Sequence, residues 1–330
     1  MSVVLLSHRL YEDGMRMLER EAKTIVADSS DLRQNLALAG QADAIVLRVG
    51  RIDRELMASC PNLRVISRPG VGIDTVDVAA ATESGIPVVI APGANLRSVA
   101  EHAVALIYAI GKNVCESHAR TAGGDFGIRN KYAAVELAGK RVGIVGFGNI
   151  GRETARICRN NDMEVSVYDP FIPERAQTQG YRREKELAAL LASCDIVSLH
   201  MPATAETRKM FGASQFAAMK PGAFLINCAR GEIVDEDALF DALSSKRLAG
   251  AAVDVMADEP MKKENRLFSL PNFIATPHMA ALTRESAART STLTAEGTLA
   301  VLRGEHWPHV ANPAVYRHPR WQNGSPPAGA

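Results

Sequence analysis

The stretch Lys140–Gly151 reads KRVGIVGFGNIG, and it decides the fold. Its apolar run, 142–145, predicts a buried strand that meets three glycines in the spacing GxGxxG. Gly146 permits the tight turn from strand to helix, Gly148 lets a phosphate approach the backbone, and Gly151 lets the helix pack close to the sheet. The helix that follows offers free N–H groups to phosphates at its N-terminus. The stretch therefore predicts a dinucleotide site in an α/β domain.

An acidic residue follows where such a site needs one. Asp169 ends the next apolar segment, VSVY. A carboxylate at this position accepts hydrogen bonds from the adenosine ribose hydroxyls, and its charge repels a 2′-phosphate. We therefore expect NAD rather than NADP. The alternative is a glycine-rich turn in another kind of α/β protein, and the strand, the helix pattern and the acid together favour the dinucleotide site.

Composition excludes several other classes. The 330 residues suggest about two domains. The net charge is +1, which gives no reason to expect nucleic acid or an anionic membrane as a partner. The five scattered cysteines form no CxxC or Cys/His cluster, so we expect free thiols and no metal site. The N-terminal apolar stretch is too short for a signal peptide, and no run approaches the ~20 residues that span a bilayer. We expect a cytoplasmic protein.

Strand and helix patterns alternate both before and after residues 97–113. This alternation predicts two domains with parallel sheets. The long apolar pattern over 97–113 predicts a buried helix, and 120–138 a connecting arm. The expected strands of the first domain are 3–7, 24–28, 44–48, 64–67 and 87–91. The six expected strands of the second, in doubly wound order, are 142–145, 164–168, 195–199, 223–227, 249–253 and 273–275.

The glycine motif lies near the middle of the chain, so we expect a folded domain before it. If the segment 303–316 returns to that domain, the first domain is discontinuous and the cofactor domain is inserted into it. We expect the cofactor domain over 98–284 and the first domain over 1–97 with 285–317. The tail 318–330 is rich in Pro and Gly, and we expect it to be flexible.

Three loops after predicted strands carry groups suited to hydride-transfer chemistry. Arg230 lies in NCARGEIVD, Asp254 and Glu259 in AAVDVMADEP, and His278 in ATPHMAA. Ligands of open α/β sheets bind at the carboxyl ends of the strands, so these side chains should lie beside the dinucleotide. Taken singly, each has an ordinary alternative as a surface ion pair, a solvated acid or a turn residue.

These segments resemble the D-isomer-specific 2-hydroxyacid dehydrogenases, from about Leu47 to Asn312. The resemblance implies two Rossmann-like or flavodoxin-like domains with doubly wound parallel sheets, the first binding substrate and the second binding NAD. It also implies hydride transfer between NAD(H) and a small anionic D-2-hydroxy acid or 2-keto acid. The segments are RPGVGIDTVDV (68–78), SVAEHAVALI (98–107), ELAGKRVGIVGFGNIG (136–151), DIVSLHMPAT (195–204), MKPGAFLINCARGEIVDEDAL (219–239) and TPHMAA (276–281).

The resemblance implies a catalytic trio of Arg230, Glu259 and His278. The planar guanidinium of Arg230 would bind the substrate carboxylate and carbonyl oxygen. His278 would donate a proton to the nascent alkoxide in reduction and accept it in oxidation. Glu259 would hydrogen-bond the imidazole and raise its pKa. A Glu at this position argues against a formate dehydrogenase, in which the resemblance implies a Gln.

The resemblance also implies cofactor contacts. Asp254 would accept from the carboxamide N–H of the nicotinamide, with helix capping as its alternative role. His102 and His200 lie in matching motifs, and we expect structural roles for both. The residues expected at the pyrophosphate are Asn149 and Ile150, those on the adenosine side Pro202 and Thr207, and those near the nicotinamide ribose Cys228 and Ala229.

For the substrate, the resemblance implies a loop at Val71 and Gly72 whose N–H groups hold a carboxylate. Arg48 matches an Arg that phosphoglycerate dehydrogenases use for their anionic substrate. A second Arg expected two positions later is replaced by Gly50, with Arg51 next, which weakens 3-phosphoglycerate as the substrate.

Two alternatives stay open beside a dehydrogenase of unspecified substrate. One is a D-3-phosphoglycerate dehydrogenase of serine biosynthesis. The other is an NAD-sensing binding protein similar to the corepressors that resemble this family, which can retain the catalytic trio. The resemblance further implies a homodimer formed through the cofactor domain.

Overall fold

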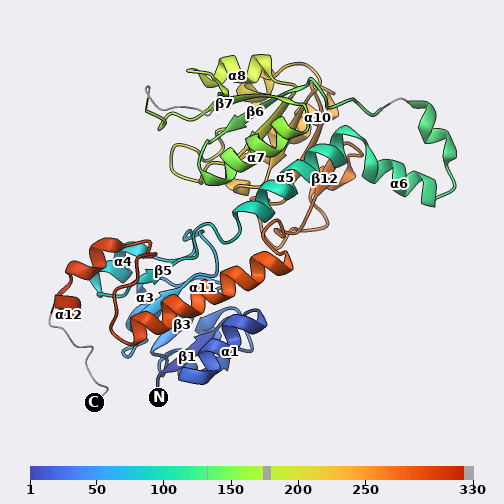
Figure 1. The fold of residues 1–330 in the computed structure, drawn as a ribbon. Helices are drawn as coiled ribbons and strands as arrows, with labels where there is room; N and C mark the ends of the chain where they lie inside the picture. Colours follow the sequence, from blue (N-terminus) through green and yellow to red (C-terminus); the bar gives the residue numbers. More distant parts are fainter. Residues whose placement is uncertain (132, 174–179, 323–330) are drawn as a thin grey trace. The chain divides into compact units, whose positions relative to one another are not determined.

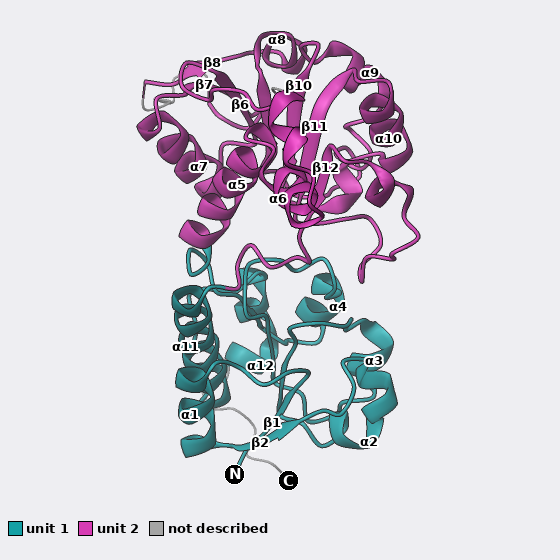
Figure 2. Cartoon of the chain, turned by 90° about the vertical axis from the view of Figure 1, so that its right-hand side faces the viewer, with its two compact units in different colours: residues 1–95, 283–330 teal, residues 96–282 magenta. Residues whose placement is uncertain are grey.

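The structure is a computed structural model that describes residues 1–131, 133–173 and 180–322 (Figure 1). The chain divides into two compact units, coloured separately in Figure 2. Unit 1 comprises Met1–Asn95 with Thr283–Ala330, and unit 2 comprises Leu96–Leu282. Both divisions lie two residues before the predicted domain bounds.

Unit 1 is built on a parallel sheet whose described strands follow the order β2-β1-β3-β4-β5. This is the flavodoxin-like doubly wound order. The strands are β1 (Val3–Leu6), β2 (Lys23–Val26), β3 (Ala44–Val46), β4 (Val65–Ser67) and β5 (Val88–Val89). The helices are α1 (Glu12–Glu21), α2 (Leu36–Ala39), α3 (Arg54–Ala58), α4 (Val78–Glu83), α11 (Arg284–Leu302) and α12 (Pro319–Gln322), with 3₁₀ segments η1 (Leu32–Asn35) and η5 (Pro313–Arg317).

Helices cover both faces of this sheet, which explains why its inner strands β1, β3 and β4 are buried, whereas the edge strand β2 begins with an exposed Lys23. On one face, Val4 and Leu6 pack with side chains of α1 and α11. On the other face, Leu5 and Ile45 pack with side chains of α3 and α4. The alternation of neighbouring residues between two cores follows from the two-residue period of a strand.

Unit 2 contains a parallel sheet in which the described strands follow the order β12-β11-β10-β9-β6-β7-β8. The glycine stretch begins with β6, an inner strand between β9 and β7. The strands are β6 (Arg141–Val145), β7 (Glu164–Tyr168), β8 (Arg182–Arg183), β9 (Ile196–Leu199), β10 (Ala223–Asn227), β11 (Leu248–Val253) and β12 (Phe273–Ala275). The helices are α5 (Leu96–Gly111), α6 (Val114–Ala122), α7 (Asn149–Asn160), α8 (Leu187–Ser193), α9 (Ala213–Ala218) and α10 (Glu236–Ser244), with 3₁₀ segments η2 (Phe126–Lys131), η3 (Gly231–Ile233) and η4 (Arg266–Ser269).

The prediction of six strands in this unit was wrong by one edge strand. β8 pairs with β7 through Arg182 and Arg183. Two charged residues form no apolar run, so the pattern along the chain did not indicate a strand. The α/β fold class itself is confirmed, with two doubly wound parallel sheets.

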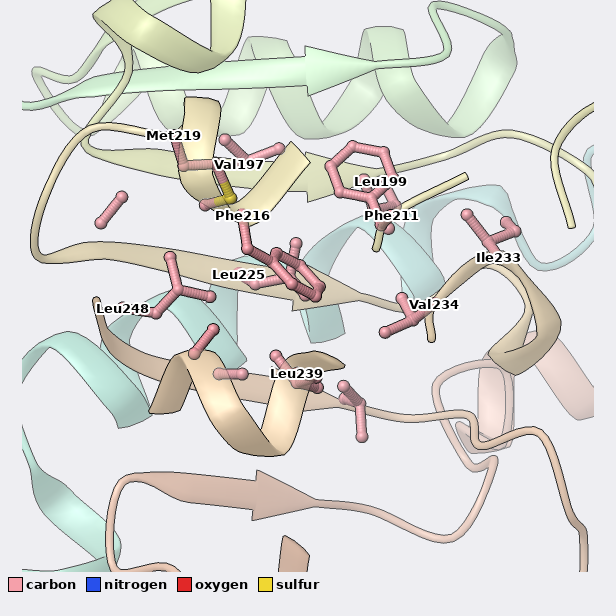
Figure 3. Close-up of a cluster of buried hydrophobic side chains, with 14 of the residues drawn as sticks. Val197, Leu199, Phe211, Phe216, Met219, Leu225, Ile233, Val234, Leu239 and Leu248 are labelled. Atoms are coloured by element: carbon pink, nitrogen blue, oxygen red, sulfur yellow. The ribbon is translucent and has the colours of Figure 1, made fainter. Parts of the chain in front are cut away.

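Two apolar layers enclose the sheet of unit 2. α5 and α7 cover one face, where Ile107 and Ala155 pack against Val142 and Ile144. The opposite face carries the core shown in Figure 3, where Phe211 and Phe216 lie over the strands with ring centroids 6.5 Å apart. The predicted long helix is α5, and it packs on α7, β10 and β11. None of the described helices is both long and apolar enough to span a membrane.

The tail predicted to be flexible from His318 is partly folded. Residues up to Gln322 are described, and they end in the short helix α12. The Trp321 indole donates to the Gly85 carbonyl at 2.9 Å and meets the Tyr316 ring edge to face at 5.2 Å. A large aromatic residue can anchor a segment whose composition otherwise predicts disorder. The remainder of the predicted tail, 323–330, lies outside the described residues.

Candidate active site

The glycine turn after β6 leaves an open cradle beside the first turn of α7. Gly146 has φ +91°, and a Cβ there would lie 2.7 Å from the His200 carbonyl. A Cβ at Gly151 would lie 2.1 Å from the Gly146 oxygen, so neither position accepts a side chain. At Gly148 a Cβ would meet nothing within 4 Å, and no side chain caps α7. The turn is therefore closed toward the protein and open at Gly148, as a bound phosphate requires.

Asp169 lies directly beyond β7 and faces this turn. Its carboxylate accepts hydrogen bonds from the Phe147 N–H at 2.8 Å and the Phe171 N–H at 2.9 Å. A carboxylate has about four lone-pair sites, so two backbone contacts leave capacity for ribose hydroxyls. The half-buried acid is thus held in place before any ligand binds.

The other predicted cofactor residues also lie after the carboxyl ends of neighbouring strands. Asn149 and Ile150 open α7. Pro202 and Thr207 lie after β9, and the Thr207 hydroxyl donates to the Pro202 carbonyl at 2.7 Å. Figure 2 shows the neighbouring strands of this sheet.

Cys228 and Ala229 follow β10 directly, and burial raises the pKa of the Cys228 thiol. The side chain of Asn227, 1% exposed, accepts from the Ala229 N–H at 3.0 Å and donates to the Arg230 carbonyl at 2.9 Å. It therefore shapes the loop that carries Arg230. The sequence interpretation missed Asn227, although a polar residue at the end of the apolar run AFLI was a usable signal.

His278 and Glu259 form a direct pair. The His278 Nδ1 lies 2.7 Å from the Glu259 Oε2. This hydrogen bond raises the pKa of His278, against the opposing effects of burial and of the Arg230 charge. With Nδ1 bound to the carboxylate, Nε2 is the ring nitrogen left for a substrate.

Arg230 follows β10 and lies close enough for its charge to act on His278. Its Nη1 donates to the Ala229 carbonyl at 2.7 Å. The next residue, Gly231, packs against the loop that carries Glu259, because a Cβ there would lie 2.0 Å from the Met256 carbonyl carbon. The fold of unit 2 thus brings together Arg230, Glu259 and His278 from three successive strand ends.

Asp254 is nearly inaccessible, with 1% of its surface exposed. Its carboxylate accepts from the Thr276 hydroxyl at 2.5 Å and from the N–H groups of Met279 and Ala280 at 3.0 and 2.8 Å. These donors belong to the His278 loop rather than to a helix N-terminus. The contact with the nicotinamide carboxamide stays a prediction.

Besides Arg230, the predicted substrate residues lie in unit 1. The Arg48 N–H donates to the Ser7 hydroxyl at 2.9 Å. The Arg68 guanidinium donates to the Gly72 carbonyl at 2.9 Å and the Arg48 carbonyl at 3.2 Å, so it ties these two loops together. Arg48 and Val71 are exposed. Arg68 was missed as a site-shaping residue, although it begins the motif RPGVGID.

The half-buried His200 lies beside the glycine turn, with its backbone carbonyl against Gly146. Its Nε2 lies 2.9 Å from the Ser198 hydroxyl, and desolvation of the ring lowers its pKa to about 4. A ring that stays neutral suits the structural role predicted for it. Among the described residues, no group of three or more His, Cys, Asp or Glu could hold a metal ion.

The comparisons with known proteins bear on this site. Residues 104–280, more than half of the chain, match the family model described as D-isomer specific 2-hydroxyacid dehydrogenase, NAD binding domain. The chain belongs to the D-isomer specific 2-hydroxyacid dehydrogenase family, and unit 2 contains its NAD-binding domain.

Two curated relatives and one solved structure illustrate the similarity. A D-3-phosphoglycerate dehydrogenase of Methanocaldococcus jannaschii is 38% identical over 94% of this chain and 59% of its own length. An (S)-sulfolactate dehydrogenase of Chromohalobacter salexigens is 40% identical over 90% of this chain and 97% of its own length. The TT0316 protein of Thermus thermophilus superposes with a TM-score of 0.85 at 32% identity, over 94% of this chain and 99% of that one. The chain spans about half to three fifths of the phosphoglycerate dehydrogenases it matches.

Replacing Asp169 tests the cofactor cradle. In Asp169→Ala, we expect the Kd for NADH to rise by about tenfold or more, because hydrogen bonds to a charged group are lost. The ratio of NADPH to NADH affinity should rise as well, since the repelling charge is gone. Fluorescence titration with both cofactors measures these effects. Asp241→Ala, which removes an exposed acid in the same unit, controls for net charge. An unchanged ratio in Asp169→Ala would remove the ribose role.

Proposed function

We propose that this chain is an NAD-dependent dehydrogenase that transfers a hydride between NAD(H) and a small anionic D-2-hydroxy acid or its 2-keto partner. The observation that carries the proposal is the His278–Glu259 pair, 2.7 Å apart, beside Arg230 in a unit that contains the family's NAD-binding domain. NAD(H) would be held by Gly146, Gly148, Gly151 and Asp169, and it would supply or accept the hydride.

The roles of the trio follow from its chemistry. Arg230 would orient the substrate through its carboxylate and carbonyl oxygen, because a planar guanidinium binds two oxygens at once. In reduction, the Nε2–H of His278 would donate its proton to the developing alkoxide. In oxidation, the neutral ring would accept that proton. Glu259 would hold the Nδ1–H and stabilise the imidazolium form.

The relatives suggest which 2-hydroxy acids this chain would use. Sulfolactate and 3-phosphoglycerate are both three-carbon 2-hydroxy acids with a second anionic group, and the relatives named for them are 40% and 38% identical to this chain. The replacement of a second Arg by Gly50 speaks against 3-phosphoglycerate. We therefore place a sulfonated or similar doubly anionic acid ahead of 3-phosphoglycerate.

Arg48 in unit 1 supplies one cation suited to such a second anion, and the N–H groups of Val71 and Gly72 suit a carboxylate. These assignments extend the family resemblance to unit 1. The alternative of an NAD-sensing binding protein predicts cofactor binding without turnover.

A homodimer formed through unit 2 is part of the proposal. α6 has no buried residue, and Val114 in it and Phe126 in η2 are 53% and 68% exposed. A second copy of the chain would cover such a segment. The proposed partners are the cofactor, the acid substrate and this second copy, with no nucleic acid or membrane, and a cytoplasmic location stays a prediction.

A substrate panel separates these possibilities. The acids are glyoxylate, hydroxypyruvate, phosphohydroxypyruvate, pyruvate and sulfopyruvate, each followed by NADH consumption. We expect the highest kcat/KM with sulfopyruvate, because the single cation of Arg48 matches the one charge of a sulfonate, whereas the second Arg expected for a phosphate is replaced by Gly50. A preference for phosphohydroxypyruvate would favour the phosphoglycerate alternative. NADH binding with no turnover of any acid would favour the sensor.

His278→Asn tests the acid–base role. We expect kcat to fall by about a hundredfold to ten-thousandfold, the range for a lost general acid, while the Kd for NADH stays unchanged. Steady-state assays and fluorescence titration give the two quantities. His309→Asn, at an exposed position of unit 1, is the matched control. Turnover near the wild-type value would exclude His278 from the reaction.

Glu259→Gln tests the pKa relationship. Because Glu259 raises the pKa of His278, reduction should be fastest below that pKa and decline as pH rises through it. Removing the carboxylate lowers the pKa, so the decline should move to lower pH. The measurement is the pH profile of kcat/KM for the keto acid. Glu264→Gln, at an exposed carboxylate, should leave the midpoint in place. An unmoved midpoint in Glu259→Gln would contradict the pairing.

A further inference from the structure

The loop that carries His278 has an unusual backbone. His278 has φ +51°, in the left-handed region that non-glycine residues rarely adopt. Its N–H donates to the Asp254 carbonyl at 2.8 Å and to the Thr276 carbonyl at 2.9 Å. Such a conformation is strained, and it persists only where the surrounding structure holds it in place. The groups that hold this loop therefore matter for the placement of the His278 ring.

The Asp254 side chain supplies most of this support. Its two oxygens accept from the N–H groups of Met279 and Ala280, the two residues that follow His278. Burial raises the pKa of Asp254, but hydrogen bonds from His102, Thr276 and the backbone outweigh it and hold the pKa below its ordinary value. The carboxylate therefore stays ionised and holds the two backbone N–H groups that follow His278.

The Thr276 hydroxyl determines whether His102 donates or accepts in the hydrogen bond between these two side chains. It lies 2.5 Å from the Asp254 Oδ1, and an ionised carboxylate can only accept, so the hydroxyl donates its single proton there. The Nε2 of His102 lies 2.9 Å from the same hydroxyl oxygen. Since that oxygen has no second proton, the His102 Nε2 must carry the hydrogen and donate. The same Nε2–H lies 3.5 Å from the Asp254 Oδ1.

A series of hydrogen bonds thus connects α5 to the His278 loop within unit 2. His102 donates to Thr276, Thr276 donates to Asp254, and Asp254 holds the N–H groups after His278. α5 packs on β10, β11 and β12, so His102 projects from a fixed element. Glu259 lies in a different loop and contacts the His278 ring. The backbone of His278 is therefore held by the hydrogen bonds of this series rather than by Glu259.

We propose that His102 is a positioning residue for the reaction, which acts through Thr276 and Asp254 to hold the His278 imidazole where it exchanges a proton with the substrate. The inference rests on the proposed function, in which His278 is the acid–base group. His102 itself touches neither substrate nor cofactor in this assignment. A histidine that serves only to fill space on α5 would be replaceable by an aromatic ring of similar size.

Two pairs of variants test the proposal. His102→Phe keeps a ring but removes the donor, and His102→Gln keeps an N–H donor. Thr276→Val removes the hydroxyl at nearly constant shape, and Thr276→Ser keeps it. We expect kcat to fall by about ten- to a hundredfold in His102→Phe and Thr276→Val, because a misplaced catalytic group loses rate on this scale. The conservative partners should recover most of the rate, and the Kd for NADH should stay constant in all four.

The double variant shows whether the two residues act as a unit. If His102 acts through Thr276, His102→Phe should cost little further rate once Thr276→Val is present. Losses that multiply, or a wild-type kcat in His102→Phe, would overturn the proposal. So would a rate loss that His102→Gln fails to recover. Thermal midpoints monitor folding, and if His102→Phe does not fold, the comparison of Thr276→Val with Thr276→Ser decides.

The failure of this inference differs from a failure of the proposed function. Loss of turnover in His278→Asn together with a wild-type rate in His102→Phe would overturn the positioning role alone. Full turnover in His278→Asn would overturn the acid–base role and the positioning role with it. His309→Phe, the same substitution at an exposed position of unit 1, is the matched control.

Discussion

The parallel sheet of unit 2 is the constraint on which the candidate site depends. Every strand of a parallel sheet ends at the same edge, so the loops after β6, β7, β10, β11 and β12 converge there. The glycine turn, Asp169, Arg230, Glu259 and His278 all lie in these loops. Helices on both faces bury the strands and hold their ends rigid. The packing of the sheet therefore places these side chains at one edge, and the contact between His278 and Glu259 adds to that placement.

The two acidic side chains near His278, Glu259 and Asp254, have different effects on the loop that carries it. Two carboxylates contact different parts of the His278 loop. Glu259 contacts the ring and raises its pKa, while buried Asp254 contacts the backbone and stays ionised through its donors. The Arg230 charge opposes the effect of Glu259 on the ring. The environment of each acid, rather than its chemical type, thus decides whether it shifts the pKa of the His278 ring or holds the backbone of the loop.

Prediction from the sequence worked where a local pattern has one physical cause. The run 142–145 and its glycines predicted β6, the turn and α7, because strand burial and close approach to phosphate require those residue types. It was wrong at β8, where two arginines pair with a neighbouring strand without an apolar signal. It was also wrong for the first residues of the C-terminal tail, where Trp321 anchors the chain on unit 1. Both errors arose where contacts with distant residues outweigh local composition.

The sequence by itself determined the dinucleotide turn, the acid that faces it and the residue types of the trio, since their chemistry is tied to short motifs. Only the tertiary structure decided what holds them. Asn227 shapes the Arg230 loop from the last position of β10, and His102 reaches Thr276 across 174 residues of chain. The direction of a hydrogen bond between such groups depends on which oxygen has a proton to give. That choice follows from the three-dimensional arrangement of donors around Asp254, which no local pattern encodes.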